Sequence, residues 1–149
     1  MYLELSPSEE RAYIAELYNS FATGREFELF LNHFLSVIGF QEVVTTKYAN
    51  DNGIDLTCSK AGIDVQGIDT MNYYVQAKRY KPTNKVQAKE IRDLKGATKR
   101  DKQGNVLNNN YINVFITTSS FTKGAVNEAE SNPNMPTILI DGKTLLNMC

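Results

Sequence analysis

Three polar side chains in two short segments have the types and spacing to act together chemically: Asp55, Gln76 and Lys78. Gln76 and Lys78 lie in the segment NYYVQAKRYK, whose Tyr and Val residues favour a strand and which Pro82 ends. We predict a strand over 73–80, and because strand side chains alternate between faces, Gln76 and Lys78 share one face. A solvated strand surface is the simpler explanation for such a pair.

The carboxylate of Asp55 gives that pair a partner. The turn-forming residues Asp51, Asn52 and Gly53 precede a strand predicted over 54–59, so Asp55 stands at the start of a strand. If this strand pairs with the next one, the Asp55 carboxylate and the Gln76 amide oxygen can bind a metal ion together, because both are ligands that Mg²⁺ accepts. A nearby ammonium group positions a water or stabilises a phosphate in its transition state. We therefore predict phosphodiester hydrolysis at this sheet edge.

Six segments carry a resemblance to a known family, in order from Gly24 to the C-terminus: GREFELFLNHFLSVIGF, NGIDL, YYVQAKRYK, VQAKEIRDLKGA, VFITTSSFTKGA and ILIDGKTLL. The chain resembles the catalytic domain of Mrr-type restriction endonucleases, a branch of the PD-(D/E)xK nuclease superfamily. The resemblance implies a Mg²⁺-dependent DNA endonuclease with Asp55, Gln76 and Lys78 at the motif positions. It also implies a supporting acid on the first helix of the fold, at Glu28. Gln76 replaces the acid that is commonest in the superfamily, as in Mrr-type members, and leaves the site one negative charge poorer.

The leading hypothesis is a restriction-like endodeoxyribonuclease of type II or IV, acting on double-stranded DNA with or without a requirement for modified bases. Asp55 and Gln76 would hold Mg²⁺, Lys78 would orient the nucleophile, and Glu28 would assist through a water. Cutting both strands needs two active sites, so a homodimer or higher oligomer is expected during cutting. Two alternatives use the same residues: a junction-resolving or repair nuclease, and a non-catalytic DNA-binding or assembly module.

The positive charge of the chain is concentrated in one span. The formal net charge is −1, but residues 78–102 hold ten Lys or Arg against three acids, giving +7 there and −8 elsewhere. A local positive field beside the candidate site attracts phosphate, although a solvated charged helix is the simpler explanation. The predicted DNA-binding residues are Arg79, Lys81, Lys85, Lys89 and Arg92.

Two helices are predicted before the first strand. Ser6, Pro7 and Glu9 indicate the start of a helix over 6–18, which precedes the family resemblance. Thr23 and Glu26 begin a second helix, which carries an apolar stripe at spacings of three and four and ends at Gly39. Glu28 falls off the centre of that stripe, where it can point towards a site at the edge of the stripe. We predict an accessory helix in 1–22 and a catalytic domain in 23–149.

The remaining elements complete an α/β fold, a restriction-endonuclease-like mixed β-sheet flanked by helices. GIDVQGID, within a long connection over 60–72, forms either an extra strand or part of a longer hairpin. In the turn TSSFTKGA, Ser120 or Thr122 caps the following helix, and phosphate binding there is the alternative. Gln87 and Glu90 are further polar candidates near the site. The other predicted elements are a strand over 41–46, a loop over 47–53, a helix over 86–100, a loop over 101–110, a strand over 111–118, a helix to about 131, a strand over 137–140 and a helix from Asp141.

Composition limits the remaining possibilities. With 149 residues, 42% of them hydrophobic and 22% charged, the chain can form one ordinary globular domain. It has no long apolar run and no signal-peptide pattern, so no membrane contact and a cytoplasmic location are expected. Cys58 and Cys149 are expected to be unpaired thiols, and these two residues with the one histidine, His33, are too few for a structural zinc site.

Overall fold

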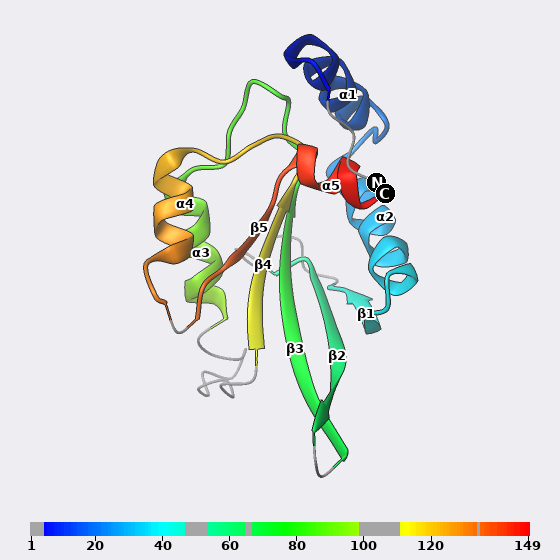
Figure 1. Cartoon of the computed structure of the whole chain (residues 1–149), viewed down its shortest axis with the longest axis vertical. Helices are drawn as coiled ribbons and strands as arrows, with labels where there is room; N and C mark the ends of the chain where they lie inside the picture. The colour runs from blue at the N-terminus through cyan, green and yellow to red at the C-terminus, as the bar shows by residue number, and fades with distance from the viewer. Residues whose placement is uncertain (1–4, 47–53, 65–66, 99–110, 134) are drawn as a thin grey trace.

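A five-stranded sheet forms the centre of this computed structural model (Figure 1). The structure describes residues 5–46, 54–64, 67–98, 111–133 and 135–149. The strands are β1 (Gln41–Thr45), β2 (Leu56–Asp64), β3 (Gly67–Lys78), β4 (Tyr111–Thr117) and β5 (Ile138–Ile140). The helices are α1 (Pro7–Asn19), α2 (Gly24–Val37), α3 (Ala88–Ala97), α4 (Lys123–Glu130) and α5 (Gly142–Met148).

The sheet is mixed, as predicted, and its strand order is β1-β2-β3-β4-β5. The first three strands pair antiparallel, whereas β4 pairs parallel with both β3 and β5. A parallel pair needs a crossover connection, and α3 and α4 lie in the two crossovers. The site strands β2 and β3 therefore lie in the middle of the sheet, where neighbours on both sides hold them.

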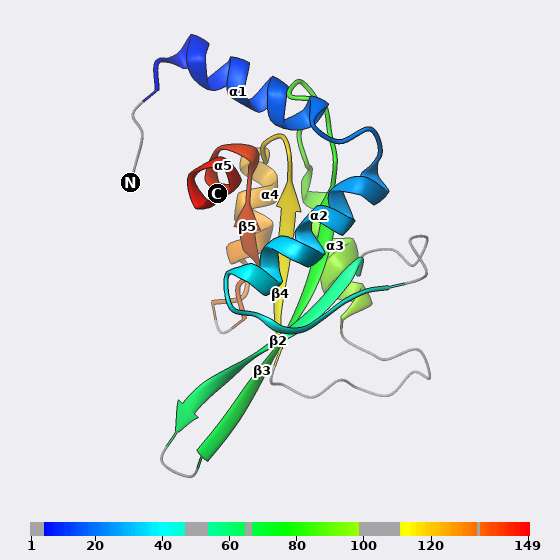
Figure 2. The same ribbon diagram turned by 90° about the vertical axis from the view of Figure 1, so that its right-hand side faces the viewer.

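The β2–β3 hairpin is longer than predicted. Its register runs from Leu56 opposite Val75 to Asp64 opposite Gly67, so the longer hairpin is correct and the long connection over 60–72 is wrong. The glycines of this segment do not end the strands, because the antiparallel pairing of β2 with β3 continues through them. The predicted strand over 73–80 thus starts earlier and ends at Lys78. Figure 2 shows the hairpin extending away from the helices.

Helices cover the two faces of the sheet and enclose two apolar clusters (Figure 1). On one face, α2 packs Phe27, Leu31 and Leu35 against strand residues that include Val75. On the other face, α3 and α4 pack around Phe115 of β4. Burying a side chain of this size stabilises the fold by roughly 1.5–3 kcal/mol, so these clusters fix the helices relative to the site strands.

The predicted helix caps are present. The hydroxyls of Ser6, Thr23 and Thr122 and the carboxylate of Asp141 each accept a hydrogen bond from a backbone N–H three residues on. Gly39 ends α2 with a φ of 111°, a conformation that glycine adopts without strain.

The helix predicted over 86–100 begins two residues later than predicted, at Ala88. Val86 lies in a short parallel bridge with Phe121, because its N–H donates to the carbonyl of Ser120 at 2.9 Å. The helix α3 therefore starts after Gln87. The loops predicted over 47–53 and 101–110 lie outside the described residues. Within the described ranges, no helix has both the length and the apolar character needed to cross a bilayer.

Candidate active site

Asp55 lies directly before β2, and the adjoining strand β3 holds it from two sides. Its backbone N–H donates to the carbonyl of Val75 at 2.8 Å. Its carboxylate oxygen Oδ2 accepts hydrogen bonds from the N–H of Ala77 at 2.9 Å and from Nε2 of Gln76 at 2.5 Å. Thr46, which follows β1, donates from its N–H to the Asp55 carbonyl at 2.8 Å. These bonds fix the orientation of the Asp55 carboxylate, and the residue as a whole is only 6% exposed.

The side-chain amide of Gln76 faces Asp55 with its nitrogen, not its oxygen. Besides the bond to Asp55, Nε2 donates to the carbonyl of Ala77 at 3.3 Å. With the nitrogen engaged by these two acceptors, the amide oxygen Oε1 is the atom of Gln76 suited to a cation. The residue is 5% exposed, so any ligand of this oxygen would be largely enclosed.

Glu28 reaches the same place from α2. It follows Phe27 at the border of the apolar stripe and is only 7% exposed, so its side chain is enclosed between the helix and the site strands. The pKa of its carboxyl is raised to about 7. Burial is the largest cause, followed by the charge of Asp55 and a hydrogen bond to Asp55. Burial also raises the pKa of Asp55, against the bond from Ala77 and the charge of Lys78. Of this pair, Glu28 is the carboxyl that keeps a proton.

Lys78 ends β3 and brings a positive charge to the two acids. The charge of its ammonium lowers the pKa of both Asp55 and Glu28, although burial outweighs this effect in each case. The residue is half-buried. The structure thus brings together Glu28, Asp55, Gln76 and Lys78 from a helix, a strand start and a strand end.

The five predicted DNA-binding residues have different surroundings. Lys81 and Lys85 are exposed between β3 and α3. Lys89 is exposed on α3, where it pairs with Asp93 at 3.4 Å. Arg79 instead stacks its guanidinium carbon 3.9 Å from the ring centroid of Tyr18, on α1, and its buried Nε has no hydrogen-bond partner in the described part of the chain.

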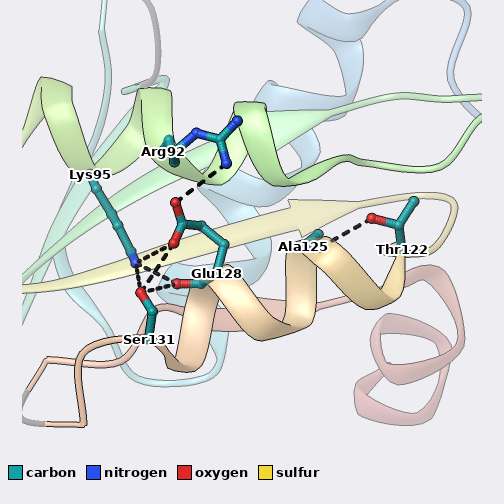
Figure 3. Close-up of polar contacts among 6 residues, drawn as sticks. All are labelled: Arg92, Lys95, Thr122, Ala125, Glu128 and Ser131. Atoms are coloured by element: carbon teal, nitrogen blue, oxygen red, sulfur yellow. Dashed lines mark hydrogen bonds and ion pairs between the residues drawn. The ribbon is translucent and has the colours of Figure 1, made fainter.

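Arg92 and the neighbouring Lys95 are engaged by an acid of α4, as Figure 3 shows. Glu128 lies 3.6 Å from Arg92 and 3.5 Å from Lys95, and Lys95 also donates to the backbone carbonyl of Glu128. These contacts lower the pKa of Glu128, together with a hydrogen bond from Ser131, which is the largest cause. Part of the basic span is therefore neutralised within the chain.

Gln87 and Glu90 serve the start of α3. The carboxylate of Glu90 accepts hydrogen bonds from the Gln87 N–H, at 2.9 Å, and from the hydroxyl of Tyr80. Burial and this bond raise the pKa of Tyr80 well above its ordinary value. Both residues take part in the helix cap, and Glu90 also holds Tyr80, in the segment after β3.

Sequence reasoning missed the residues that hold the end of β3. The turn TSSFTKGA was predicted to cap a helix or to bind phosphate, and Thr122 does cap α4. Thr117 and Thr118, however, direct their hydroxyls to the backbone of Lys78 and Tyr80. The available signal was the replacement of apolar residues by two threonines at the end of a buried strand.

Two solved restriction endonucleases share this fold. The MspJI restriction endonuclease in complex with a 27-mer oligonucleotide matches with a TM-score of 0.73 and 23% identity, over 97% of this chain and 32% of that chain. The DNA modification-dependent restriction endonuclease AspBHI matches with a TM-score of 0.74 and 19% identity, over 98% of this chain and 36% of that chain. The chain thus spans about a third of the length of these two proteins.

The family follows from a match in sequence. A family model named Mrr_cat, described as restriction endonuclease, matches residues 20–149, so the chain belongs to this family and the predicted resemblance is confirmed. The match begins directly after α1. No curated protein matches the chain.

Proposed function

We propose that this chain is the catalytic unit of a DNA endonuclease that hydrolyses phosphodiester bonds with the help of Mg²⁺. The observation that carries the proposal is that two acids, an amide and an ammonium group lie together at one end of strands β2 and β3. Membership of a restriction endonuclease family supports the reaction class.

The oxygen donors of the site fit a hard divalent cation. Asp55 and Gln76 would hold it, with Glu28 close by, and Mg²⁺ needs few protein oxygens because it keeps several waters. Burial is the largest cause of the raised pKa of both acids, so their negative charges are poorly solvated, and this supports a bound cation that would neutralise them. When bound, the ion would neutralise phosphate charge and make a coordinated water more acidic.

The residues of the chain have separate tasks in this hydrolysis. Lys78 orients the attacking water and stabilises the charge that develops on the phosphate oxygens. Glu28 orders a water beside the phosphate. The attacking water loses a proton as its oxygen forms a new bond to phosphorus, the ester bond to the leaving oxygen breaks, and that oxygen takes up a proton. The Ala77 N–H and the Gln76 amide keep Asp55 in one orientation throughout.

Double-stranded DNA is the proposed substrate. The exposed side chains of Lys81, Lys85 and Lys89 are the proposed phosphate contacts, since they surround the segment that follows the site strand. Arg79 is stacked on Tyr18, and the ion pairs of Arg92 with Glu128 and of Lys89 with Asp93 would compete with phosphate for these cations. Cutting both strands requires two such sites, and we propose a homodimer or higher oligomer during cutting.

Cleavage of plasmid DNA tests this proposal. Wild-type protein and Lys78→Ala are incubated with unmodified and cytosine-modified plasmid, with Mg²⁺ or with EDTA. Modified DNA is included because AspBHI is described as modification-dependent. Lys78→Ala should slow cleavage by about 100-fold or more, the loss typical of removing one group that stabilises developing charge. Its affinity for DNA in EDTA should stay within about twofold, since one phosphate contact at most is lost.

The matched control is Lys123→Ala, an exposed lysine at the start of α4, which should cleave like the wild type. Unchanged cleavage by Lys78→Ala would refute the mechanism. DNA binding by the wild type without any Mg²⁺-dependent cleavage would favour a non-catalytic module. Cleavage of four-way junctions but not of linear duplex would favour a junction-resolving nuclease.

A further inference from the structure

The end of β3, which carries Lys78, is held by two buried hydroxyl groups of the neighbouring strand. We propose that Thr117 and Thr118 are positioning residues that fix the backbone at Lys78 and thereby place its ammonium in the active site. The inference rests on the function proposed for Lys78 and assigns a role to residues that touch neither DNA nor metal.

The hydroxyls take over where the strand ladder stops. The pairing of β3 with β4 ends at Lys78 opposite Thr117. From there, the Thr117 hydroxyl donates to the Lys78 carbonyl at 2.8 Å. The Thr118 hydroxyl accepts from the Tyr80 N–H at 3.0 Å and donates to the Tyr80 carbonyl at 2.8 Å. The backbone is therefore fixed both at Lys78 and two residues beyond it.

Burial excludes a direct role for these groups in binding DNA. Thr117 and Thr118 are 0% exposed and the following Ser119 is 2% exposed. Each threonine hydroxyl hydrogen is used in a bond to a backbone carbonyl, and the Ser119 hydroxyl donates to the carbonyl of Asn84 at 2.8 Å. The hydroxyls of Thr117, Thr118 and Ser119 are therefore engaged within the chain and do not serve as donors to a phosphate.

The turn itself is firmly seated against the start of α5. The N–H of Gly142 donates to the carbonyl of Ser119 at 2.9 Å. A β-carbon at Gly142 would lie 2.3 Å from the carbonyl oxygen of Thr118, so the helix start approaches the turn as closely as a glycine permits. Thr118 thus has a fixed base from which to hold the strand end.

The consequence for catalysis is geometric. A lysine ammonium lies at the end of a four-carbon side chain, so a small rotation of its backbone moves the charge a long way. A misplacement of about 1 Å can slow an enzymatic reaction by roughly 100-fold. A strand end with unpaired buried carbonyl and N–H groups would rotate to satisfy them. The Thr118 hydroxyl provides both partners of Tyr80, and the Thr117 hydroxyl, together with the Thr118 N–H at 3.3 Å, provides those of the Lys78 carbonyl.

The test uses valine, which keeps the threonine shape but lacks the hydroxyl. Thr117→Val and Thr118→Val should slow single-turnover DNA cleavage by about 10- to 100-fold. Their DNA dissociation constants in EDTA should stay within about twofold, since no phosphate contact is lost. Thr117→Ser and Thr118→Ser keep the hydroxyl and should restore most of the rate. The matched control is Thr98→Val, since Thr98 is fully buried and its hydroxyl, among the residues that the structure describes, bonds carbonyls of α3.

Amide hydrogen exchange gives a readout without metal or activity. In Thr118→Val the Tyr80 N–H loses its acceptor, and its exchange should accelerate by about tenfold or more, whereas Thr98→Val should leave it unchanged. If Thr118→Val does not fold, Thr117→Val carries the test, because it leaves the bonds of Tyr80 intact. Normal cleavage by both valine variants, with Lys78→Ala inactive, overturns this inference and leaves the proposed function standing. Full activity of Lys78→Ala overturns both.

Discussion

Glu28 should make the stability of the domain fall as the pH rises from weakly acidic to neutral. The pKa of its carboxyl rises from an ordinary 4.5 to about 7, because burial and Asp55 disfavour its charge. Between these values the unfolded chain has released the proton and the folded protein keeps it, so the free energy of unfolding decreases with pH and is lowest above 7. At about 1.4 kcal/mol per pKa unit, this shift corresponds to a loss of about 3 kcal/mol.

The substitution Glu28→Gln removes this dependence. At pH 5 the protonated acid and the amide are both neutral and similar in shape, so the two proteins should be about equally stable. At pH 8 the variant should be more stable than the metal-free wild type by about 3 kcal/mol. Asp55, with its raised pKa, leaves a dependence of the same sign in the variant. The lowered pKa of Glu128 has the opposite effect on stability: it makes the free energy of unfolding decrease as the pH falls below the ordinary pKa of a glutamate.

Urea unfolding followed by circular dichroism measures this effect at pH 5 and pH 8, with EDTA or with Mg²⁺. Because a cation bound only by the folded state stabilises it, Mg²⁺ should stabilise the wild type more at pH 8 than at pH 5. The matched control is Glu130→Gln, an exposed acid at the end of α4, which should follow the wild type. Parallel pH dependence of Glu28→Gln and the wild type in EDTA would refute the assignment of the shared proton to Glu28.

Two further substitutions test the surroundings of the site. Gly142→Ala should destabilise the domain by about 1–3 kcal/mol, because the new β-carbon overlaps the Thr118 carbonyl, and thermal unfolding measures the loss; an unchanged melting temperature would mean that the turn yields. Glu128→Gln frees Arg92 and Lys95 from their ion pairs, so DNA affinity in EDTA should rise and its dependence on salt should steepen. An unchanged salt dependence in a fluorescence anisotropy titration would show that these cations do not face DNA.

Local signals in the sequence were sufficient for much of the fold. Each helix cap predicted at Ser6, Thr23 and Asp141 is a hydrogen bond between residues three apart, so neighbouring residues determine it. The proximity of Asp55 and Gln76 also followed from local information, because antiparallel pairing of two adjacent strands puts residues at their ends side by side. The catalytic roles of these residues remain predictions.

Contacts between distant segments account for what was missed. The charge of 78–102 was predicted from that span alone, yet Tyr18 and Glu128 engage two of its arginines from other helices. The length of the β2–β3 hairpin depends on ladder partners that glycines alone do not reveal. The support of Lys78 by Thr117 depends on a parallel pairing across a crossover, which no local pattern specifies.

The contact between Arg79 and Tyr18 bears on how the catalytic unit can be shortened. The family match starts at residue 20, yet Leu17 is part of the apolar cluster and Tyr18 covers the residue next to Lys78. A protein trimmed to 20–149 would uncover part of that cluster and leave Arg79, whose Nε is buried, without its aromatic neighbour. The first helix therefore packs against the rest of the chain, and a shortened chain that keeps these contacts should begin before Ser6.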